Sequence, residues 1–230
     1  MKLAIIPARG GSKRIKDKNI VDFCGRPLIS YSLEAAKASG LFDQIHVSTE
    51  SLKIKEIVES LGFKIDFLRD ESLADDHTGV VPVLKWVLEE YKKRGKYFTE
   101  ICLIMPTAPL ISAEDLKKAH EVFMANHKKI PTMACGKYPV PIDWAFVETT
   151  RKTVIPLDSE KISLRSQDLP KYFFDTGAFS FLSDLHLTEG FKAEFVPYHL
   201  PIERAVDIDE QADLDLAEIL FLGQKAKKGS

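Results

Sequence analysis

The chain has 230 residues, of which 45% are hydrophobic and 29% charged, a composition that can build one α/β domain of ordinary size with a small appendage. Its 32 basic and 34 acidic residues leave a net charge of −2, which excludes an overall electrostatic attraction to nucleic acid or to an anionic membrane. No apolar run approaches the roughly 20 residues that span a bilayer, and the apolar start of the chain is too short for a signal-peptide core. Cys24, Cys102 and Cys135 lack zinc-ligand spacing, which favours free thiols in a reducing cytoplasm.

Apolar runs of strand length alternate with amphipathic segments along the chain. The expected strands are residues 3–6, 44–48, 64–68, 100–105, 131–135, 178–182 and 194–198. The expected helices are residues 27–39, 52–61, 79–93, 113–126 with Ser112 as N-cap, and 210–222, followed by a short basic tail that we expect to fray. This order predicts an α/β fold, a Rossmann-like and mostly parallel twisted sheet with helices on both faces. Such sheets bind ligands at the carboxyl ends of their strands, so the loops at those ends are the first candidates for a site.

Residues 136–175 break this rhythm. They contain four prolines and scattered aromatic residues without clean helical periodicity. We interpret them as an inserted arm or subdomain within a single domain that covers residues 1–230. A long irregular loop is the alternative, although such loops are uncommon in compact domains unless they are functional.

Residues 6–20, IPARGGSKRIKDKNI, follow the first expected strand and gather cations around two glycines. Glycines allow a backbone to approach a ligand closely, and successive N–H groups form a nest for an anion. The block matches neither the Walker loop nor the dinucleotide fingerprint. It predicts a cradle for a triphosphate, with a solvated basic loop as the alternative. The cations are Arg9, Lys13, Arg14, Lys16 and Lys18, and the glycines are Gly10 and Gly11.

Asp207 and Asp209 are separated by one residue just before the last expected helix. On an extended segment their side chains face the same side, and two like charges so close are unfavourable unless a cation lies between them. Magnesium suits carboxylate oxygens combined with phosphate oxygens and water. Acidic residues also favour helix N-termini, and the spacing alone does not separate this alternative from a metal site.

Three further blocks place polar or aromatic residues near the expected ligand edge. Residues 67–79 (FLRDESLADDHTG) contain Arg69, Asp76 and Thr78, whereas His77 is expected to be an exposed or capping residue. Residues 103–112 (LIMPTAPLIS) form a proline turn after a buried strand. Residues 163–179 (SLRSQDLPKYFFDTGAF) combine an arginine and an amide with aromatic side chains, as a sugar that carries a carboxylate would require.

Together these blocks resemble the CMP–sialic acid synthetase (acylneuraminate cytidylyltransferase) family over residues 2–220. The block at 6–20 is the most specific, and PTAPL, DTGAF and VDIDEQADL follow in the expected order. Within the family the chain is most similar to the branch that acts on pseudaminic acid. Met105 and Ile111 stand where sialic and legionaminic acid synthetases usually have Gln and Arg, and Phe174 stands where they have a second Arg. These departures remove polar contacts and favour a more hydrophobic, differently configured sugar.

The resemblance implies transfer of CMP from CTP to the anomeric hydroxyl of a nine-carbon acidic sugar by a cytoplasmic homodimer, with Mg²⁺ or another divalent cation such as Mn²⁺. It implies nucleotide binding by Ala8, Arg9, Gly10, Gly11, Ser12, Lys13, Lys18, Asn19, Arg69, Asp76 and Thr78. It implies sugar binding by Met105, Thr107, Arg165, Gln167, Tyr172 and Phe174, metal binding by Asp207 and Asp209, and catalysis by Arg9, Lys18 and Asp209. We hypothesise that Asp209 or a metal-bound hydroxide accepts the anomeric proton.

The alternatives are of three kinds. The first is the same enzyme acting on legionaminic or N-acetylneuraminic acid. The second is another nucleotidyltransferase, such as a 3-deoxy-manno-octulosonate cytidylyltransferase or a guanylyl- or uridylyltransferase. The third is a catalytically silent protein that binds sugar nucleotides, which would have no need of the aspartate pair.

Overall fold

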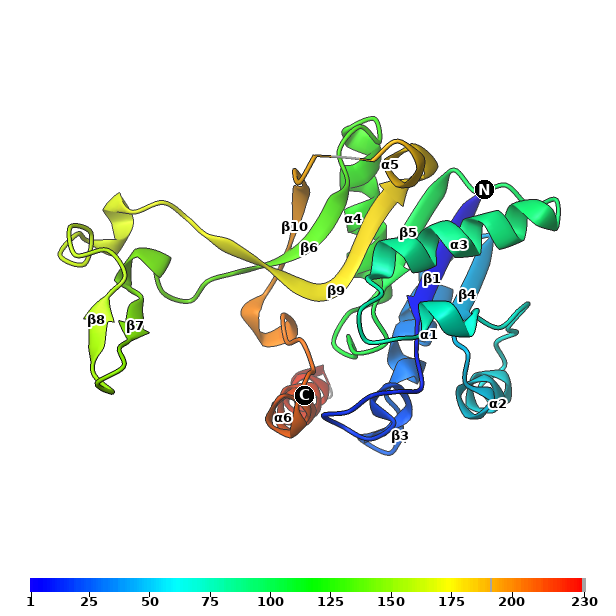
Figure 1. Ribbon diagram of the computed structural model, residues 1–230, viewed down its shortest axis with the longest axis horizontal. Helices are drawn as coiled ribbons and strands as arrows, with labels where there is room; N and C mark the ends of the chain where they lie inside the picture. The colour runs from blue at the N-terminus through cyan, green and yellow to red at the C-terminus, as the bar shows by residue number, and fades with distance from the viewer. Residues whose placement is uncertain (191, 229–230) are drawn as a thin grey trace.

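The computed structural model of the protein describes residues 1–190 and 192–228, and within them the chain forms a central six-stranded sheet with helices on both faces (Figure 1). The strands lie in the order β10, β6, β9, β5, β1, β4. Their bounds are β1 Lys2–Pro7, β4 Gln44–Ser48, β5 Glu100–Ile104, β6 Thr132–Lys137, β9 Phe173–Ser183 and β10 Val196–Leu200. β1 runs parallel to β4 and β5, and β10 runs parallel to β6, so the predicted mostly parallel sheet is confirmed.

Strand β9 is antiparallel to both of its neighbours, β5 and β6. The chain leaves the sheet at the carboxyl end of β6 and returns at the same edge, where Lys137 pairs with Phe173. A strand that re-enters where the previous strand ended must run in the opposite direction. For the same reason β9 begins earlier than the expected strand at 178–182.

The helices divide between the two faces of the sheet. Their bounds are α1 Ile29–Ser39, α2 Leu52–Ser60, α3 Val80–Lys93, α4 Ala113–Ala125, α5 Asp184–Thr188 and α6 Gln211–Lys228. Ala4 and Ile6 of β1 pack in one buried cluster with residues of α1, α2 and α4. Leu3 and Ile5 pack in a second cluster with α3 and α5. The alternation of side chains along a strand therefore gives β1 two apolar faces, and each face is covered by helices.

Helix boundaries follow local capping chemistry. At the start of α4, Ser112 Oγ accepts a hydrogen bond from the Asp115 amide, and Asp115 Oδ2 accepts one from the Ser112 amide at 2.9 Å. This capping box confirms Ser112 as the predicted N-cap. α1 ends at Gly40, which adopts the left-handed conformation that glycine allows at low cost.

Helix α6 continues to Lys228, well beyond the expected end at 222. The expectation of a frayed tail was therefore wrong for residues 224–228, and residues 229–230 lie outside the described part of the chain. Across residues 1–190 and 192–228, no helix combines the length and apolarity needed to cross a membrane.

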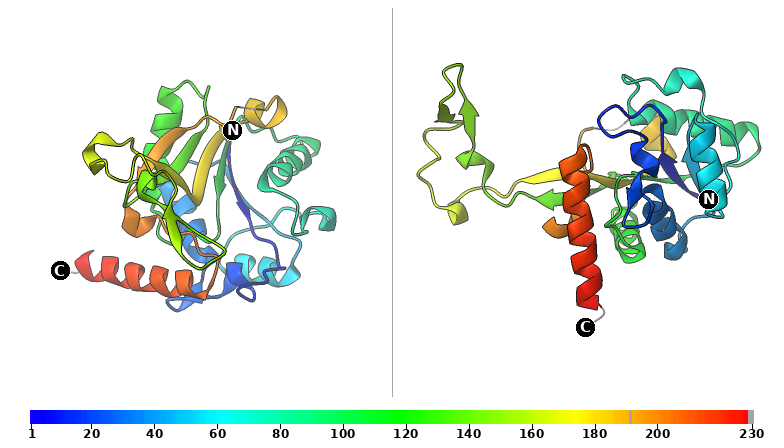
Figure 2. Two further views of the ribbon diagram at one scale, coloured as in Figure 1. Left: turned by 60° about the vertical axis from the view of Figure 1, so that its left-hand side comes forward. Right: turned by 90° about the horizontal axis from the view of Figure 1, so that it is seen from below.

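A third buried cluster joins the start of the chain to its end. Ile15, from the basic block, packs with Ile208 and with Leu214 of α6. Two short strands, β2 Asp22–Phe23 and β3 Arg26–Pro27, form a hairpin beside this cluster. The loop after β1 and the segment before α6 are therefore held side by side at the carboxyl edge of the sheet (Figures 1 and 2).

The strand expected at 64–68 does not form. Ile65 is buried in the first cluster and Phe67 packs against the second, so the run buries its side chains without pairing in the sheet. The segment reaches the end of β4 through the Arg69 amide, which donates to the Thr49 carbonyl at 2.8 Å. The pattern of a short apolar run does not distinguish a strand from a buried segment without strand pairing.

Residues 138–172 form an arm that projects away from the sheet (Figure 1). It carries the hairpin β7 Phe146–Glu148 and β8 Val154–Pro156. Asp143 is 5% exposed, and its Oδ1 accepts hydrogen bonds from Lys161 Nζ at 2.9 Å and from the Tyr172 hydroxyl at 3.2 Å. The arm thus has its own polar contacts.

The remaining short elements are 3-10 helices at Lys18–Ile20, Glu71–Leu73, Ile142–Trp144, Ser166–Asp168 and Ile202–Arg204.

Candidate active site

A cavity of about 540 Å³ opens at the carboxyl ends of β1 and β5. It is bounded by the loop after β1, the segment before α3, the proline turn after β5 and the segment before α6. The predicted residues that line it are Arg9, Ser12, Lys13, Lys18, Asn19, Arg69, Asp76, Thr78, Met105, Thr107, Asp207 and Asp209. Four segments that are far apart in the sequence therefore meet in one place.

Two of the cations in this cavity share one carboxylate. Arg9 Nη1 donates to Asp76 Oδ1 at 2.6 Å and to the Asp75 carbonyl at 3.1 Å, while Lys13 contacts Asp76 Oδ2. Lys13 and Arg9 lower the pKa of Asp76 to about 2. Asp76 thus supplies the negative charge between two cations that were predicted to bind phosphate.

A second pair of cations converges on Asp209. Lys18 Nζ donates to the Ile208 carbonyl at 2.7 Å and to Asp209 Oδ1 at 3.0 Å, and Arg14 Nη2 lies 3.0 Å from the same oxygen. The hydrogen bond from Lys18 and the charges of both cations lower the pKa of Asp209. Arg14 was predicted as one of the cations of the triphosphate cradle, without a partner of its own. Its contact with Asp209 shows that it belongs to the site.

Asp207 has a different environment from Asp209. Its pKa is raised by burial, and next by the neighbouring charge of Asp209. The residue is exposed at the cavity, and Gly177 of β9 lies close against one side of its carboxylate. Within the described residues the carboxylate has no hydrogen-bond donor. An ionised carboxylate in this setting favours an added cation.

Gly177, in the DTGAF motif, explains how Asp207 fits against β9. It adopts φ +60°, and a Cβ there would lie 2.8 Å from Asp207 Oδ2. The glycine is therefore required both by the backbone conformation and by the closeness of the carboxylate. The motif marked this position, but only the fold shows which side chain it accommodates.

The aspartate pair fits a divalent cation that takes its other ligands from a substrate. Across residues 1–190 and 192–228, no group of three or more His, Cys, Asp or Glu side chains could hold a metal. Magnesium retains water and is commonly bound by one or two carboxylates together with phosphate oxygens. Asp207 and Asp209 provide that number of protein ligands beside the cation-lined cavity.

The glycine loop differs from the predicted anion nest. The Gly10 amide donates to Glu50 Oε1 at 2.6 Å, and the Ser12 amide donates to the Gly10 carbonyl at 3.1 Å. The Ala8 amide is bonded to the carbonyl of Ser48 at 2.8 Å. Gly11 lies in a smaller depression beside Arg9 and Asp76. The amides of residues 8, 10 and 12 therefore bond to the protein itself and do not form an open nest for an anion.

Arg69 is 5% exposed and anchors the opposite wall. Its Nε donates to Ser48 Oγ at 3.0 Å and its Nη2 to the Ser48 carbonyl at 2.5 Å. Burial lowers the pKa of Arg69. Val80 and Val83 of α3 add an apolar surface that sequence reasoning missed. Their position in the first turn of a helix, directly after a polar loop at the expected ligand edge, could have indicated that they line the site.

The residues predicted to bind the sugar do not all reach this cavity. Arg165 and Tyr172 lie on the arm, where Arg165 Nε bonds to Asp168 Oδ2 at 3.1 Å. Gln167 lies there as well, in the 3-10 helix Ser166–Asp168. Phe174 packs over Gly136, where an added Cβ would overlap its ring. Within one chain, Met105 and Thr107 are the predicted sugar residues that line the cavity.

Ile111, one of the positions that differs from the sialic and legionaminic acid synthetases, does not line this cavity. It is 7% exposed and borders separate depressions beside α1 and α6. The proline turn therefore directs Met105 toward the cavity and Ile111 away from it.

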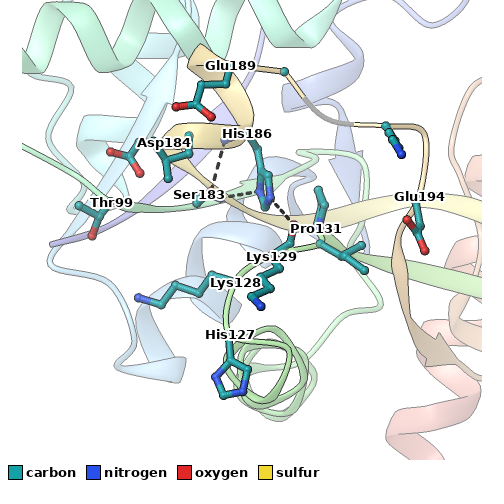
Figure 3. A pocket seen from close by; sticks show the side chains of 14 residues that line it. Thr99, His127, Lys128, Lys129, Pro131, Ser183, Asp184, His186, Glu189 and Glu194 are labelled. Atoms are coloured by element: carbon teal, nitrogen blue, oxygen red, sulfur yellow. Dashed lines mark hydrogen bonds between the residues drawn. The ribbon is translucent and has the colours of Figure 1, made fainter.

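A second cavity, of about 560 Å³, lies at the opposite edge of the sheet (Figure 3). Thr99 and Pro131, which precede β5 and β6, place it at the amino ends of those strands. Its His186 accepts the Ser183 amide at 3.1 Å and lies 3.1 Å from the Lys129 carbonyl. It contains none of the predicted site residues, and open parallel sheets bind ligands at the other edge. The 540 Å³ cavity is therefore the candidate active site.

A mostly parallel sheet with a cation-lined cavity and a carboxylate pair at its carboxyl edge defines the protein as a nucleotidyltransferase. A family model described as cytidylyltransferase matches residues 3–224. The chain belongs to the cytidylyltransferase family.

Individual relatives agree with this assignment. The chain is 40% identical over 222 residues to a pseudaminic acid cytidylyltransferase of Campylobacter jejuni, with 95% of each chain covered. It is 28% identical over 227 residues to an N-acylneuraminate cytidylyltransferase of Escherichia coli, a match that covers 94% of this chain and 51% of that protein. A solved structure of CMP:2-keto-3-deoxy-manno-octonic acid synthetase complexed with CTP has a TM-score of 0.71 at 16% identity, covering 97% of this chain and 99% of that one.

Proposed function

We propose that the protein joins CMP from CTP to the anomeric hydroxyl of pseudaminic acid and releases pyrophosphate. The observation that carries this proposal is the convergence of Arg9, Lys13, Arg14 and Lys18 on one cavity that also contains Asp207 and Asp209. Four cations suit a triphosphate, and the carboxylates suit the cation that accompanies it. The similarity to curated pseudaminic acid cytidylyltransferases supports the choice of sugar.

Phosphoryl transfer requires positioning and charge neutralisation more than covalent chemistry from the protein. In the proposed reaction the anomeric oxygen bonds to the α-phosphorus, the bond to the bridging oxygen breaks, and pyrophosphate leaves. Arg9 and Lys18 would stabilise the charge that accumulates on the phosphoryl oxygens and on the leaving group. Without a nucleotide, ion pairs with Asp76 and Asp209 hold Arg9 and Lys18, respectively, at the cavity wall.

Asp207 and Asp209 would hold Mg²⁺ or another divalent cation such as Mn²⁺. When bound, such an ion neutralises phosphate charge and polarises the reacting phosphate. Lys18 and Arg14 lower the pKa of Asp209, which makes it a weak proton acceptor and disfavours our hypothesis that it is the general base. Its contacts suit a second role, in which it orients Lys18.

We place the remaining sugar contacts on a second copy of the chain. Arg165, Gln167 and Tyr172 lie on the arm that projects away from the sheet (Figure 1), and none of the three lines the cavity of its own chain. Phe146 and Val154 on the arm hairpin are more than half exposed, an apolar surface that a partner would cover. A homodimer in which each arm approaches the partner's cavity would use both features. The three free thiols and the use of CTP are consistent with our expectation of a cytoplasmic enzyme.

The test is pyrophosphate release with CTP and Mg²⁺ in the presence of pseudaminic, legionaminic or N-acetylneuraminic acid, each offered separately. We expect release with pseudaminic acid. Release with another acid would replace the sugar and keep the reaction. If CTP binds but no pyrophosphate is released with any of the three acids, a silent binding protein would be favoured. Pyrophosphate release from UTP or GTP would mean that the nucleotide substrate is not CTP.

A further inference from the structure

The peptide group between Arg9 and Gly10 is held at both ends by side chains from other parts of the chain. Its carbonyl, on Arg9, accepts a hydrogen bond from Asn19 Nδ2 at 2.8 Å. Its amide, on Gly10, donates to Glu50 Oε1 at 2.6 Å. Because a peptide group is planar, two fixed ends define the orientation of the whole unit.

This peptide group lies where the conformation of the loop determines the position of both phosphate-binding cations. Arg9 contributes the carbonyl of this peptide group, and its side chain lines the cavity. Asn19 is 7% exposed and directly follows Lys18, whose ammonium lines the cavity from the other end of the loop. The hydrogen bond from Asn19 therefore sets the distance between the backbones of Arg9 and Lys18.

Glu50 supplies the other restraint from outside the loop. It lies between the end of β4 and Ser51, the N-cap residue of α2, so its backbone is positioned by elements outside the loop. The contact requires a close approach, because a Cβ on Gly10 would lie 3.1 Å from Ser51 Cβ and 3.3 Å from Glu50 Oε1. A hydrogen bond from an amide to a carboxylate is stronger than one between neutral groups.

The second oxygen of Glu50 is buried and has no hydrogen-bond partner within residues 1–190 and 192–228. The charge of this carboxylate acts on Arg69, whose Nε and Nη2 donate to Ser48 and whose Nη1 donates to the Leu73 carbonyl. The charge of Glu50 stabilises the buried guanidinium of Arg69, so the carboxylate also has a structural use. The hydrogen bond to the Gly10 amide is separate from that use, because what it requires from residue 50 is an acceptor at this place.

We propose that Glu50 is a positioning residue for nucleotide binding, which fixes the Arg9–Gly10 peptide group so that Arg9 and Lys18 are presented to the triphosphate of CTP at a set spacing. This inference rests on the proposed function, because it takes CTP as the ligand of the cavity. Glu50 acts through the loop and need not touch the nucleotide itself.

The test compares Glu50→Gln with Glu50→Leu, two variants of similar size that both lack the charge. The glutamine retains an acceptor for the Gly10 amide, whereas the leucine has none. We expect the leucine variant to lose about 10- to 100-fold in kcat/KM for CTP, with a higher KM for CTP and an unchanged KM for the sugar, because small displacements of binding groups are costly. We expect the glutamine variant to stay within about threefold of the wild type. Glu56→Leu, at an exposed position of α2, is the matched control.

The readouts separate positioning from folding and from the proposed function. A smaller folded fraction would lower kcat but leave both KM values unchanged, so a rise confined to the KM for CTP identifies positioning. If the leucine variant does not fold, Glu50→Asp, which withdraws the acceptor by one methylene, should show the same selective rise. Equal kinetics for glutamine and leucine, whether both normal or both impaired, would overturn the proposal. Calorimetric binding of CTP needs no sugar, so an error in the sugar leaves the comparison valid, whereas absence of CTP binding by the wild type would refute the proposed function itself.

Discussion

Lys18 donates a hydrogen bond to the main-chain carbonyl of Ile208, which is 190 residues away in the sequence. The same ammonium also bonds to the carboxylate of Asp209. The side chain is 16% exposed, so these contacts are shielded more than those of a surface lysine. One residue thus joins the predicted phosphate loop to the predicted metal-binding segment, and a disturbance of either segment should reach the other.

Replacement of Lys18 by methionine should lower kcat by about 10²- to 10³-fold, the loss typical of removing one preorganised group that stabilises charge in a transition state. Lys16→Met is the matched control, because Lys16 belongs to the same basic block but is exposed and does not line the cavity. Steady-state pyrophosphate release measures both variants. Comparable activity of the two would show that the position of Lys18 carries no special role.

Replacement of Asp207 or Asp209 by asparagine should abolish turnover and leave the circular dichroism spectrum unchanged. Each substitution halves the negative charge of the proposed metal site, and chelation of divalent cations should likewise stop the wild type. Asp215→Asn, on the exposed surface of α6, should retain activity and its dependence on Mg²⁺. Near-normal turnover by either site variant would show that the metal assignment is wrong.

The sequence predicted the elements of the sheet and the segments of the site because both depend on local patterns. The periodicity around Leu3–Ile6 and the capping residue Ser112 act within a few residues of themselves. The strand at 64–68 was wrong because its apolar residues, Ile65 among them, pack against helices instead of pairing in the sheet. That choice depends on neighbours that a local pattern does not contain.

The partners of each site residue could not be predicted in the same way. The sequence placed Arg9 and Asp76 in one site but gave no reason to pair them, and it treated the Gly10 amide as free for a ligand although Glu50 occupies it. Glu50 lies in no motif that we singled out. Such contacts depend on the distance between segments, which only the assembled fold defines.

Asp76 should compete with the triphosphate for Arg9 and Lys13. Asp76→Asn removes this competing charge, so CTP should bind more tightly, by up to about fivefold at low ionic strength, since exposed ion pairs contribute at most about 1 kcal/mol. The gain should shrink as salt is added. Calorimetric titration at two salt concentrations measures it, with Asp70→Asn as a control at an exposed position outside the cavity. Weaker binding would show that Asp76 contacts the nucleotide directly, as the family resemblance implies.

Met105 is the substituted position that lines the cavity, so it should contribute to the choice of sugar. Met105→Gln restores the residue usual in sialic and legionaminic acid synthetases. It should raise the ratio of kcat/KM for N-acetylneuraminic acid over that for pseudaminic acid, because a glutamine can pair with polar groups that a thioether leaves unpaired. Ile111→Gln, outside the cavity, should leave the ratio unchanged, and equal shifts for both variants would refute a role of Met105 in specificity.

His46 should make the folded state sensitive to mild acid. It is completely buried, and its Nδ1 lies 3.2 Å from the hydroxyl of Tyr91, which in turn donates to Asp66. Burial lowers the pKa of His46 to about 3 from an ordinary value of 6.5. Between these two pH values His46 is protonated in the unfolded chain but neutral in the folded chain. The free energy of unfolding must therefore decrease as pH falls below 6.5.

The loss from this one residue should reach about 2 kcal/mol between pH 7.5 and pH 5.0, at about 1.4 kcal/mol for each pH unit below 6.5. His46→Phe keeps a ring against Phe67, whose centroid lies 4.4 Å from that of His46, and removes the titrating group. Urea unfolding at the two pH values should therefore show a drop that is smaller by that amount in the variant, whatever its absolute stability. His77→Gln, at a surface histidine, should retain the wild-type drop. An unchanged drop in His46→Phe would mean that His46 accepts its proton within the fold.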